Sequence, residues 1–282
     1  HLRPLVEGDE VRDWRADGVH AIWPYDPTTL QSEGAEPIQR FLWPWRAQLS
    51  DRVAYGLTQL GRGLKWFEYS MFFRERFRTP LSIAFAFVAT HNHFVIDCGG
   101  KVFKQSAPII KLPVDATFDH HHRLLGVLNS STACFWLRQV SHNKGNEGYQ
   151  SGIKSEAWEK FQEFTAAGVS KYPLPGGQPL ALARQLDALA QEYATQLPGA
   201  VCKQGVPTRA DLDAARQKAE AIRRRMIFLQ EELDWECYHL YGLTAEPLTR
   251  PGDPLELRLG ERAFEVVLAR SGEKTAWFDR HR

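Results

Sequence analysis

The sequence has 282 residues, of which 43% are hydrophobic and 24% are charged, a composition typical of a folded globular protein rather than a disordered chain. Lys and Arg (35) almost balance Asp and Glu (34), so a nucleic-acid surface would need a local concentration of basic residues. No apolar stretch reaches the roughly 20 residues that span a bilayer. We therefore expect no membrane contact and a cytoplasmic location.

The cysteines and the N-terminus give further expectations. Cys98, Cys134, Cys202 and Cys237 are far apart and form no CxxC pair, a pattern typical of reduced thiols used as small apolar residues. The chain begins at His1 without Met or a signal-peptide pattern, and we expect a fragment of a longer protein.

Short apolar segments predict mainly β-structure in the first 175 residues. Residues 82–88 are apolar and aromatic, as in a buried strand. Residues 93–97, the turn at 98–100 and residues 101–103 together predict a β-hairpin, and residues 107–112 predict another strand. Helical spacing follows at residues 119–127 and 131–140, and residues 155–159 are typical of a helix start. We expect His120, His121 and His122 to be solvated, and the Asn129-Ser130 pair to serve as a cap or a core hydrogen bond.

A long helical hairpin is predicted after the Pro/Gly-rich residues 172–177, which we interpret as a boundary. One helix covers residues 180–193; the second has Thr208 as N-cap, Asp211 at the third helical position and Gly242 as its end. The two should pair in antiparallel fashion. Residues 263–268 fit a helix or a strand. The predicted class is α+β: a β-rich domain at 1–175, a helical hairpin at 176–243 and a partial C-terminal segment at 244–282.

Catalytic signatures are missing from the sequence. An amino-methyltransferase needs an Asn/Asp/Ser-Pro-Pro-aromatic loop and a glycine-rich turn for S-adenosylmethionine, and neither occurs. No P-loop, GxSxG or HExxH motif occurs either. The adjacent His91, Asn92 and His93 lack a third ligand at a sensible spacing, so a metal site there is the weaker interpretation. We predict no catalytic residue, metal or cofactor in this chain.

Three passages resemble the specificity region of type IIG/IIL restriction-modification methyltransferases. They are residues 67–85 (FEYSMFFRERFRTPLSIAF), residues 92–97 (NHFVID) with 106–113 (SAPIIKLP), and residues 124–136 (LLGVLNSSTACFW). Further segments resemble the PglX-type adenine-specific DNA methyltransferases of type 2 BREX phage-defence systems: residues 140–145, 158–164, 233–243, 263–268 and 277–281. One departure is the loop at 146–152 (NEGYQSG), where that family is glycine-rich.

The resemblance implies a target-recognition domain that holds duplex DNA at a short site. An absent catalytic domain of the same protein would methylate adenine N6 with S-adenosylmethionine, and so mark host DNA against phage. Whether this chain is itself an enzyme stays open.

The residues themselves suggest two DNA-contacting regions. Between residues 62 and 104, seven basic residues stand against three acidic ones; we interpret this as a phosphate-contacting patch, with a solvated strand edge as the alternative. On a strand, alternate residues would share one face. The patch candidates are Arg74, Arg76, Arg78, Lys101, Lys104 and Gln105. The loop at 142–154 carries amide and basic side chains suited to base edges, although an ordinary surface turn is the alternative. Its candidates are His142, Asn143, Lys144, Asn146, Tyr149, Gln150 and Lys154.

The rival hypothesis is a protein-interaction module. Arg223–Arg225 on the long helix and the tryptophans of the N-terminal segment could dock other defence-system proteins or a phage inhibitor. These tryptophans are Trp14, Trp23, Trp43, Trp45 and Trp66.

Overall fold

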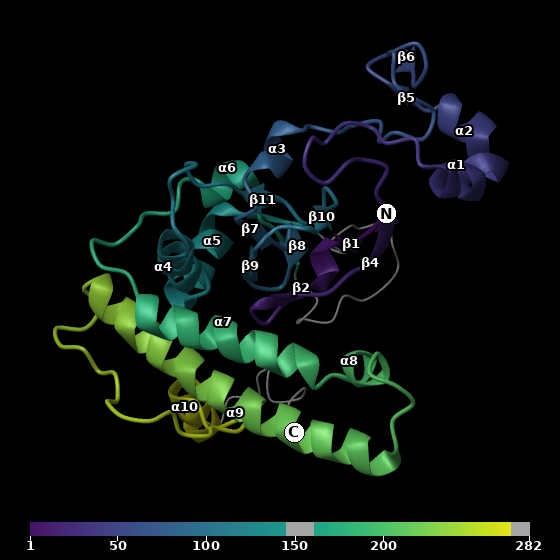
Figure 1. Cartoon of the computed structure of the whole chain (residues 1–282). Coiled ribbons are helices and arrows are strands. Elements are labelled where there is room, and N and C mark those ends of the chain that lie inside the picture. Colours follow the sequence, from purple (N-terminus) through teal and green to yellow (C-terminus); the bar gives the residue numbers. More distant parts are fainter. Residues whose placement is uncertain (145–160, 272–282) are drawn as a thin grey trace, which may run out of the picture.

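The computed structural model describes residues 1–144 and 161–271 (Figure 1). The strands are β1 (Leu2–Val6), β2 (Val11–Arg12), β3 (Arg15–Ala16), β4 (Val19–Ile22), β5 (Val53–Ala54), β6 (Leu57–Thr58), β7 (Ser82–Phe85), β8 (Val88–Ala89), β9 (Phe94–Asp97), β10 (Val102–Phe103), β11 (Ile109–Ile110), β12 (His142–Asn143) and β13 (Gln162–Glu163). The helices are α1 (Glu36–Leu42), α2 (Arg46–Ser50), α3 (Glu75–Arg78), α4 (Phe118–Leu128), α5 (Ser131–Val140), α6 (Ala166–Val169), α7 (Leu180–Thr195), α8 (Pro198–Cys202), α9 (Arg209–Leu240) and α10 (Ala263–Ser271), with 3-10 turns η1 (Gly8–Glu10) and η2 (Trp43–Trp45). This mixture of helices and small sheets confirms the predicted α+β class.

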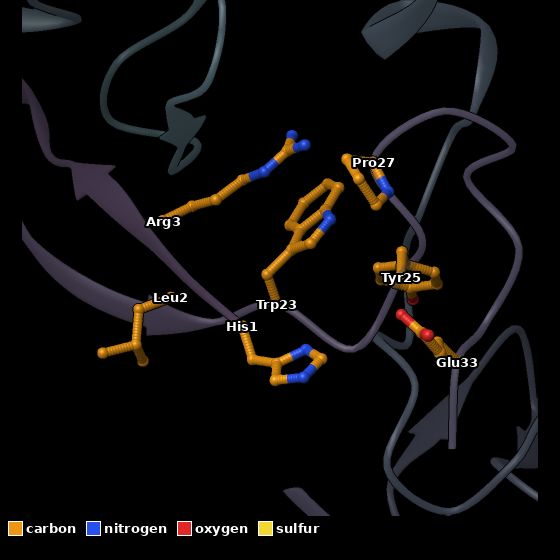
Figure 2. Close-up of a pocket in the computed structure, with 7 residues that line it drawn as sticks. All are labelled: His1, Leu2, Arg3, Trp23, Tyr25, Pro27 and Glu33. Atoms are coloured by element: carbon orange, nitrogen blue, oxygen red, sulfur yellow. The ribbon is translucent and has the colours of Figure 1, made fainter. Parts of the chain in front are cut away.

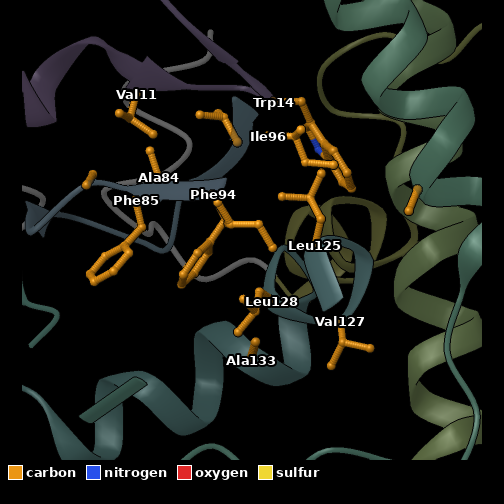
Figure 3. Packing of buried hydrophobic residues seen from close by; sticks show 14 of the residues in the cluster. Val11, Trp14, Ala84, Phe85, Phe94, Ile96, Leu125, Val127, Leu128 and Ala133 are labelled. Atoms are coloured by element: carbon orange, nitrogen blue, oxygen red, sulfur yellow. The ribbon is translucent and has the colours of Figure 1, made fainter. Parts of the chain in front are cut away.

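A three-stranded sheet of order β11-β7-β9 lies in the hydrophobic core. β7 and β9 are antiparallel, with Phe85 opposite Phe94, and every residue of both strands is buried. A strand without a solvent-facing side is continuously apolar, which explains the pattern of residues 82–88. The sheet packs with α4 through Leu125 and Leu128 (Figure 3).

β10 pairs with β1 rather than β9, so the predicted hairpin of residues 93–103 is wrong. β10 lies parallel to β1, with Leu5 opposite Val102, in a sheet of order β10-β1-β4. Tertiary packing decides this pairing, because Val102 is buried in a cluster with Trp23 and Tyr25. Two-residue strands have little local preference that could oppose such burial.

The junction between α4 and α5 confirms the structural role predicted for Asn129 and Ser130. The Asn129 side chain accepts a hydrogen bond from Phe94 N at 2.9 Å and donates one to Phe94 O at 2.8 Å. Ser130 is the N-cap of α5 and accepts from Ala133 N, while its hydroxyl donates to Val127 O at 2.7 Å. The two side chains therefore supply hydrogen-bond partners to backbone groups of β9, α4 and α5.

The helices α7 and α9 lie side by side as the predicted antiparallel hairpin, with α8 between them in sequence (Figure 1). Thr208 caps α9: its hydroxyl accepts from Asp211 N at 3.3 Å, and the Asp211 carboxylate accepts from Thr208 N at 2.9 Å. Gly242 follows α9 with a φ of 71°, a conformation that glycine adopts without strain. Both predicted helix ends are confirmed.

One hydrophobic cluster joins the hairpin to the sheets. It contains Leu186 of α7, Leu233 of α9, Leu125 of α4 and Phe94 of β9. The regions before and after residue 175 therefore share a core, and the division into 1–175, 176–243 and 244–282 stays a prediction.

His121 and His122 are buried, so the prediction that they are solvated is wrong; only His120 is exposed. His122 Nε2 lies 3.0 Å from the Asp187 carboxylate on α7, and its Nδ1 lies 3.1 Å from Phe118 O. Because α4 packs against α7, this part of α4 faces protein rather than water. The partner is 65 residues away in the sequence, which explains why the sequence did not reveal it.

The segment after α9 returns along that helix. The Glu256 carboxylate lies 3.7 Å from Arg224 Nη1 and 3.9 Å from Arg225 Nε, and Leu257 N donates to Arg224 O. Residues 263–271 then form α10, so the open choice between helix and strand is settled as helix.

Residues 35–66 stand away from the rest of the described chain (Figure 1). This segment, here named the arm, contains α1, η2, α2 and the hairpin of β5 and β6. Its base is held by the buried side chain of Gln59, whose amide donates to Glu68 O at 2.9 Å and to Lys65 O at 3.2 Å. Few apolar side chains of the arm are buried; Ile38 is one.

Candidate nucleic-acid interface

The three arginines of the predicted basic patch lie on the short helix α3 and its N-cap, not on a strand. Arg74 is the N-cap, and Arg74, Arg76 and Arg78 are all exposed. Phe77 points inward, with its ring centroid 5.2 Å from that of Trp23. On a strand, Phe77 would face away from the three arginines. Here residues 75–78 form one helical turn, and this turn brings the Phe77 ring against the Trp23 cluster. The expectation of a strand face is therefore wrong: all three side chains are exposed, but helical spacing puts Arg76 on a different face of the turn from Arg74 and Arg78.

α3 presents positive charge to solvent. The Arg76 guanidinium lies 4.5 Å from the centroid of the Phe73 ring, and Arg78 Nη2 lies 3.2 Å from the Glu75 carboxylate. Three arginines and one glutamate leave a net charge of +2 over residues 74–78. Exposed guanidinium groups at this density are suited to phosphate oxygens.

An aromatic cluster fixes the position of α3. The Trp23 ring makes edge contacts with Tyr25, Tyr69 and Phe72, and the Tyr25 ring stacks on Phe72 at a centroid distance of 3.8 Å. The Tyr25 hydroxyl accepts from Tyr69 N at 2.8 Å, and the Tyr69 hydroxyl donates to Ile22 O at 2.5 Å. Burial raises the pKa of both tyrosines, that of Tyr69 to about 12, so both hydroxyls stay protonated at neutral pH.

A cavity of about 350 Å³ opens over this cluster (Figure 2). The Arg3 guanidinium lies 3.9 Å from the Trp23 ring centroid, and Glu33 lies on the other side of the cavity. Trp23 and Tyr25 are buried beneath this cavity, so a cation and a carboxylate stand at its edges. Arg3 and Glu33 belong to no local motif, so the sequence alone does not indicate them.

The first residues of the predicted base-reading loop are fixed by a sheet of order β12-β13-β8. His142 lies opposite Glu163, and Asn143 Oδ1 accepts from Gln162 Nε2 at 2.6 Å. Lys144 Nζ lies 3.1 Å from the Glu163 carboxylate and 5.4 Å from the Phe87 ring centroid. All three of the predicted residues 142–144 are exposed. The other loop candidates lie outside the described residues: Asn146, Tyr149, Gln150 and Lys154.

The remaining patch candidates lie next to carboxylates. Lys101 Nζ is 2.8 Å from the Asp97 carboxylate, which is buried, and Lys104 Nζ is 2.5 Å from Glu7. Gln105 is exposed beside Lys104. Because their charges are partly offset, these lysines contribute less positive potential than α3 does.

Two residues of the His91-Asn92-His93 triplet, Asn92 and His93, are buried in the fold. The Asn92 amide is buried and donates to Leu128 O at 2.6 Å. Burial, together with the neighbouring His91 and Arg12, lowers the pKa of His93 to about 2, so this imidazole is neutral at physiological pH. Within residues 1–144 and 161–271, no group of three or more His, Cys, Asp or Glu side chains is arranged to hold a metal ion. All four cysteines are free thiols.

Two comparisons with known proteins identify relatives of the chain. Residues 226–282 match the family model of a domain of unknown function, DUF7008. The chain is also 44% identical over 299 aligned positions to the adenine-specific methyltransferase PglX of Streptomyces coelicolor. That alignment covers 100% of the chain and 24% of the relative, so the chain spans about a quarter of the relative's length. None of the described helices, the long α9 included, has the length and apolar character that crossing a membrane requires.

The aligned portion of the Streptomyces protein is its C-terminal region. The chain is therefore related over its whole length to the C-terminal region of PglX, which confirms the resemblance found in the sequence.

Proposed function

We propose that this chain is the DNA-recognition part of an adenine-specific DNA methyltransferase and that it holds duplex DNA for a catalytic region elsewhere in the same protein. The observation that carries the proposal is α3, where three exposed arginines are held by an aromatic cluster. The relation to PglX supplies the substrate, since adenine methylation acts on a base that must be presented by a bound duplex.

In this proposal α3 contacts the phosphate backbone. Arg74 and Arg76 have exposed guanidinium groups, and Phe77 anchors the turn to Trp23. Phosphate contacts set the position of a protein on DNA but carry no sequence information themselves. A rigidly held turn loses little conformational freedom when it binds, which favours a defined register on the duplex.

Base reading is assigned to the segment that begins at β12. Asn143 and Lys144 are exposed at the edge of a three-stranded sheet, and amide and ammonium groups can bond adenine or guanine edges in the major groove. The later candidates of the loop remain predictions: Asn146, Tyr149, Gln150 and Lys154. S-adenosylmethionine would bind in the catalytic region, because the motifs that hold it do not occur in this sequence.

The test is the binding of a mixed-sequence duplex by the wild-type chain and by the Arg74→Ala/Arg76→Ala double variant, measured by fluorescence anisotropy at several salt concentrations. If both arginines contact phosphates, the double variant binds more weakly, and the slope of log affinity against log salt becomes shallower by about 2. Arg216→Ala is the control, because Arg216 is an exposed arginine that lies outside α3, near the start of α9.

Equal affinities and slopes for the wild type and the double variant would contradict the assignment of α3. A similar loss in Arg216→Ala would show a general charge effect rather than a defined contact.

The second candidate function is a protein-interaction module for other defence-system proteins or a phage inhibitor. The structure gives two residues of its basic cluster another role, since Arg224 and Arg225 lie within 4 Å of Glu256 and hold the returning segment. Arg223 is exposed, so it is the arginine of this cluster that could contact a partner protein. Charge reversal at Arg223 should then abolish partner binding and leave DNA affinity unchanged.

A further inference from the structure

The tip of the arm has an unusual residue in a tight turn. β5 and β6 form an antiparallel hairpin in which Ala54 lies opposite Leu57, so the two turn residues are Tyr55 and Gly56. Both have positive φ, 55° and 78°. Two-residue turns of this kind favour Asn, Asp or Gly at both positions, because a Cβ atom is crowded in the left-handed region. A tyrosine here therefore works against local stability.

Packing within the chain does little to compensate for this conformation. The Tyr55 side chain is 76% exposed, the highest value for an aromatic residue in the described ranges. Its ring lies beside Arg62, whose guanidinium is 5.5 Å from the ring centroid. Strained residues that the surrounding fold does not need are found mostly at binding sites. The ring is thus held outward at the end of a projecting hairpin.

The surroundings of Tyr55 combine apolar surface with positive charge. Val53, Leu57 and Leu60 are each more than half exposed on the same hairpin and the turn that follows it. On the helical side of the arm, Arg46 lies 4.9 Å from the ring centroid of Trp43, which is also exposed. The arm carries five basic and two acidic residues, a net charge of +3: Arg40, Arg46, Arg52, Arg62 and Lys65 against Glu36 and Asp51.

We propose that the arm is a second DNA contact, in which the hairpin tip inserts Tyr55 and Leu57 at a base step while the exposed Arg40 and Arg46 contact the flanking phosphates. This inference rests on the proposed function, because it requires that the chain binds duplex DNA. Apolar side chains that wedge between base pairs from a positively charged element are a known way of distorting a duplex. The net charge of +3 favours a polyanion over a second copy of the same basic surface.

Insertion would help the reaction proposed above. Extruding an adenine costs unstacking energy, and a wedge that already separates a base step lowers that cost. The Tyr55 ring would replace part of the lost stacking.

The experiment compares wild type, Tyr55→Asn and Val206→Asn in binding to a mixed-sequence duplex that contains 2-aminopurine. Asparagine tolerates positive φ, so Tyr55→Asn should keep or raise the melting temperature while removing the ring. We expect its DNA affinity to fall about tenfold and the 2-aminopurine fluorescence increase seen with wild type to disappear. Val206 is 99% exposed and lies outside the arm, so Val206→Asn should behave as wild type.

Each result has a defined meaning. If wild type does not bind the duplex, the proposed function fails and the inference fails with it. If wild type binds and Tyr55→Asn binds equally well with the same fluorescence change, the inference is overturned and the proposed function stands. A change in oligomeric state without a change in DNA affinity would also overturn it, because the arm would then be a protein interface.

Discussion

The buried Asp234 of α9 and the partly buried Arg262, just before α10, form an ion pair, with Oδ2 and Nη2 2.5 Å apart. The same guanidinium bonds Glu231 at 2.7 Å, and the Asp234 carboxylate also accepts from Ser131 N at 2.7 Å, at the start of α5. Although burial alone would lower it, the Asp234 and Glu231 carboxylates raise the pKa of Arg262. These contacts fasten the C-terminal segment and α9 to the core that carries the proposed DNA surface.

Removing the cation from this group should destabilise the fold strongly. Arg262→Met keeps much of the side-chain volume but leaves two buried carboxylates without their partner, which costs about 3–5 kcal/mol. Urea unfolding of the variant should show this loss, whereas Arg216→Met, at a site where the arginine is 81% exposed, should change stability by less than about 0.5 kcal/mol. A loss below about 1 kcal/mol in Arg262→Met would show that the ion pair contributes little.

Asn129 should be indispensable to the junction of α4, α5 and β9. Asn129→Ala removes the partners of Phe94 N and Phe94 O, and each unsatisfied buried backbone group costs about 1–3 kcal/mol. We expect a fall in the free energy of unfolding of at least about 2 kcal/mol in chemical denaturation. The exposed Gln105→Ala serves as control, and a similar small change in both variants would contradict the role of Asn129.

Stability should depend on pH through His93. Its folded-state pKa of about 2 is below the ordinary value of 6.5, so between these values the unfolded state binds more protons. The free energy of unfolding should therefore fall as pH decreases below 6.5, by up to about 1.4 kcal/mol per pH unit. Urea unfolding at pH 7 and pH 5 measures this, and His93→Gln should show a weaker pH dependence. Identical pH dependence in wild type and variant would rule out this contribution.

Asn143 and Lys144 should affect DNA binding more than folding. If they contact bases, Asn143→Ala and Lys144→Ala each weaken binding by about 1–3 kcal/mol. The ion pair of Lys144 with Glu163 is largely exposed, so the melting temperature of Lys144→Ala should change little. Asn143→Ala also removes the partner of the buried Gln162 amide, so its melting temperature should fall modestly without loss of the fold. Unchanged affinity in both variants would remove the base-reading assignment of this segment.

Local signals predicted those features of the fold that depend on neighbouring residues. The Thr208 cap, the end of α9 before Gly242 and the buried strand β7 follow from residue type and periodicity within a few positions. The Asn129-Ser130 junction was also predictable, because short polar side chains between two helical patterns are typical of caps.

Features that depend on distant residues were missed. β10 pairs with β1 across about 100 residues because Val102 is buried beside Trp23, and His122 meets Asp187 only after α4 packs on α7. The arginines near residue 76 were found as a group, but their helical turn depends on where Phe77 packs. The Tyr55-Gly56 turn had a local signal, a glycine between two short apolar runs, that would have indicated a hairpin.

The central claim is that this chain binds duplex DNA through phosphate contacts, and the affinity of the wild-type chain for a mixed-sequence duplex across a salt series tests it most directly. Three phosphate contacts from Arg74, Arg76 and Arg78 predict a slope of log affinity against log salt of about −2.7 or steeper. Absence of binding at low salt, or an affinity that does not change with salt, would contradict the proposed function.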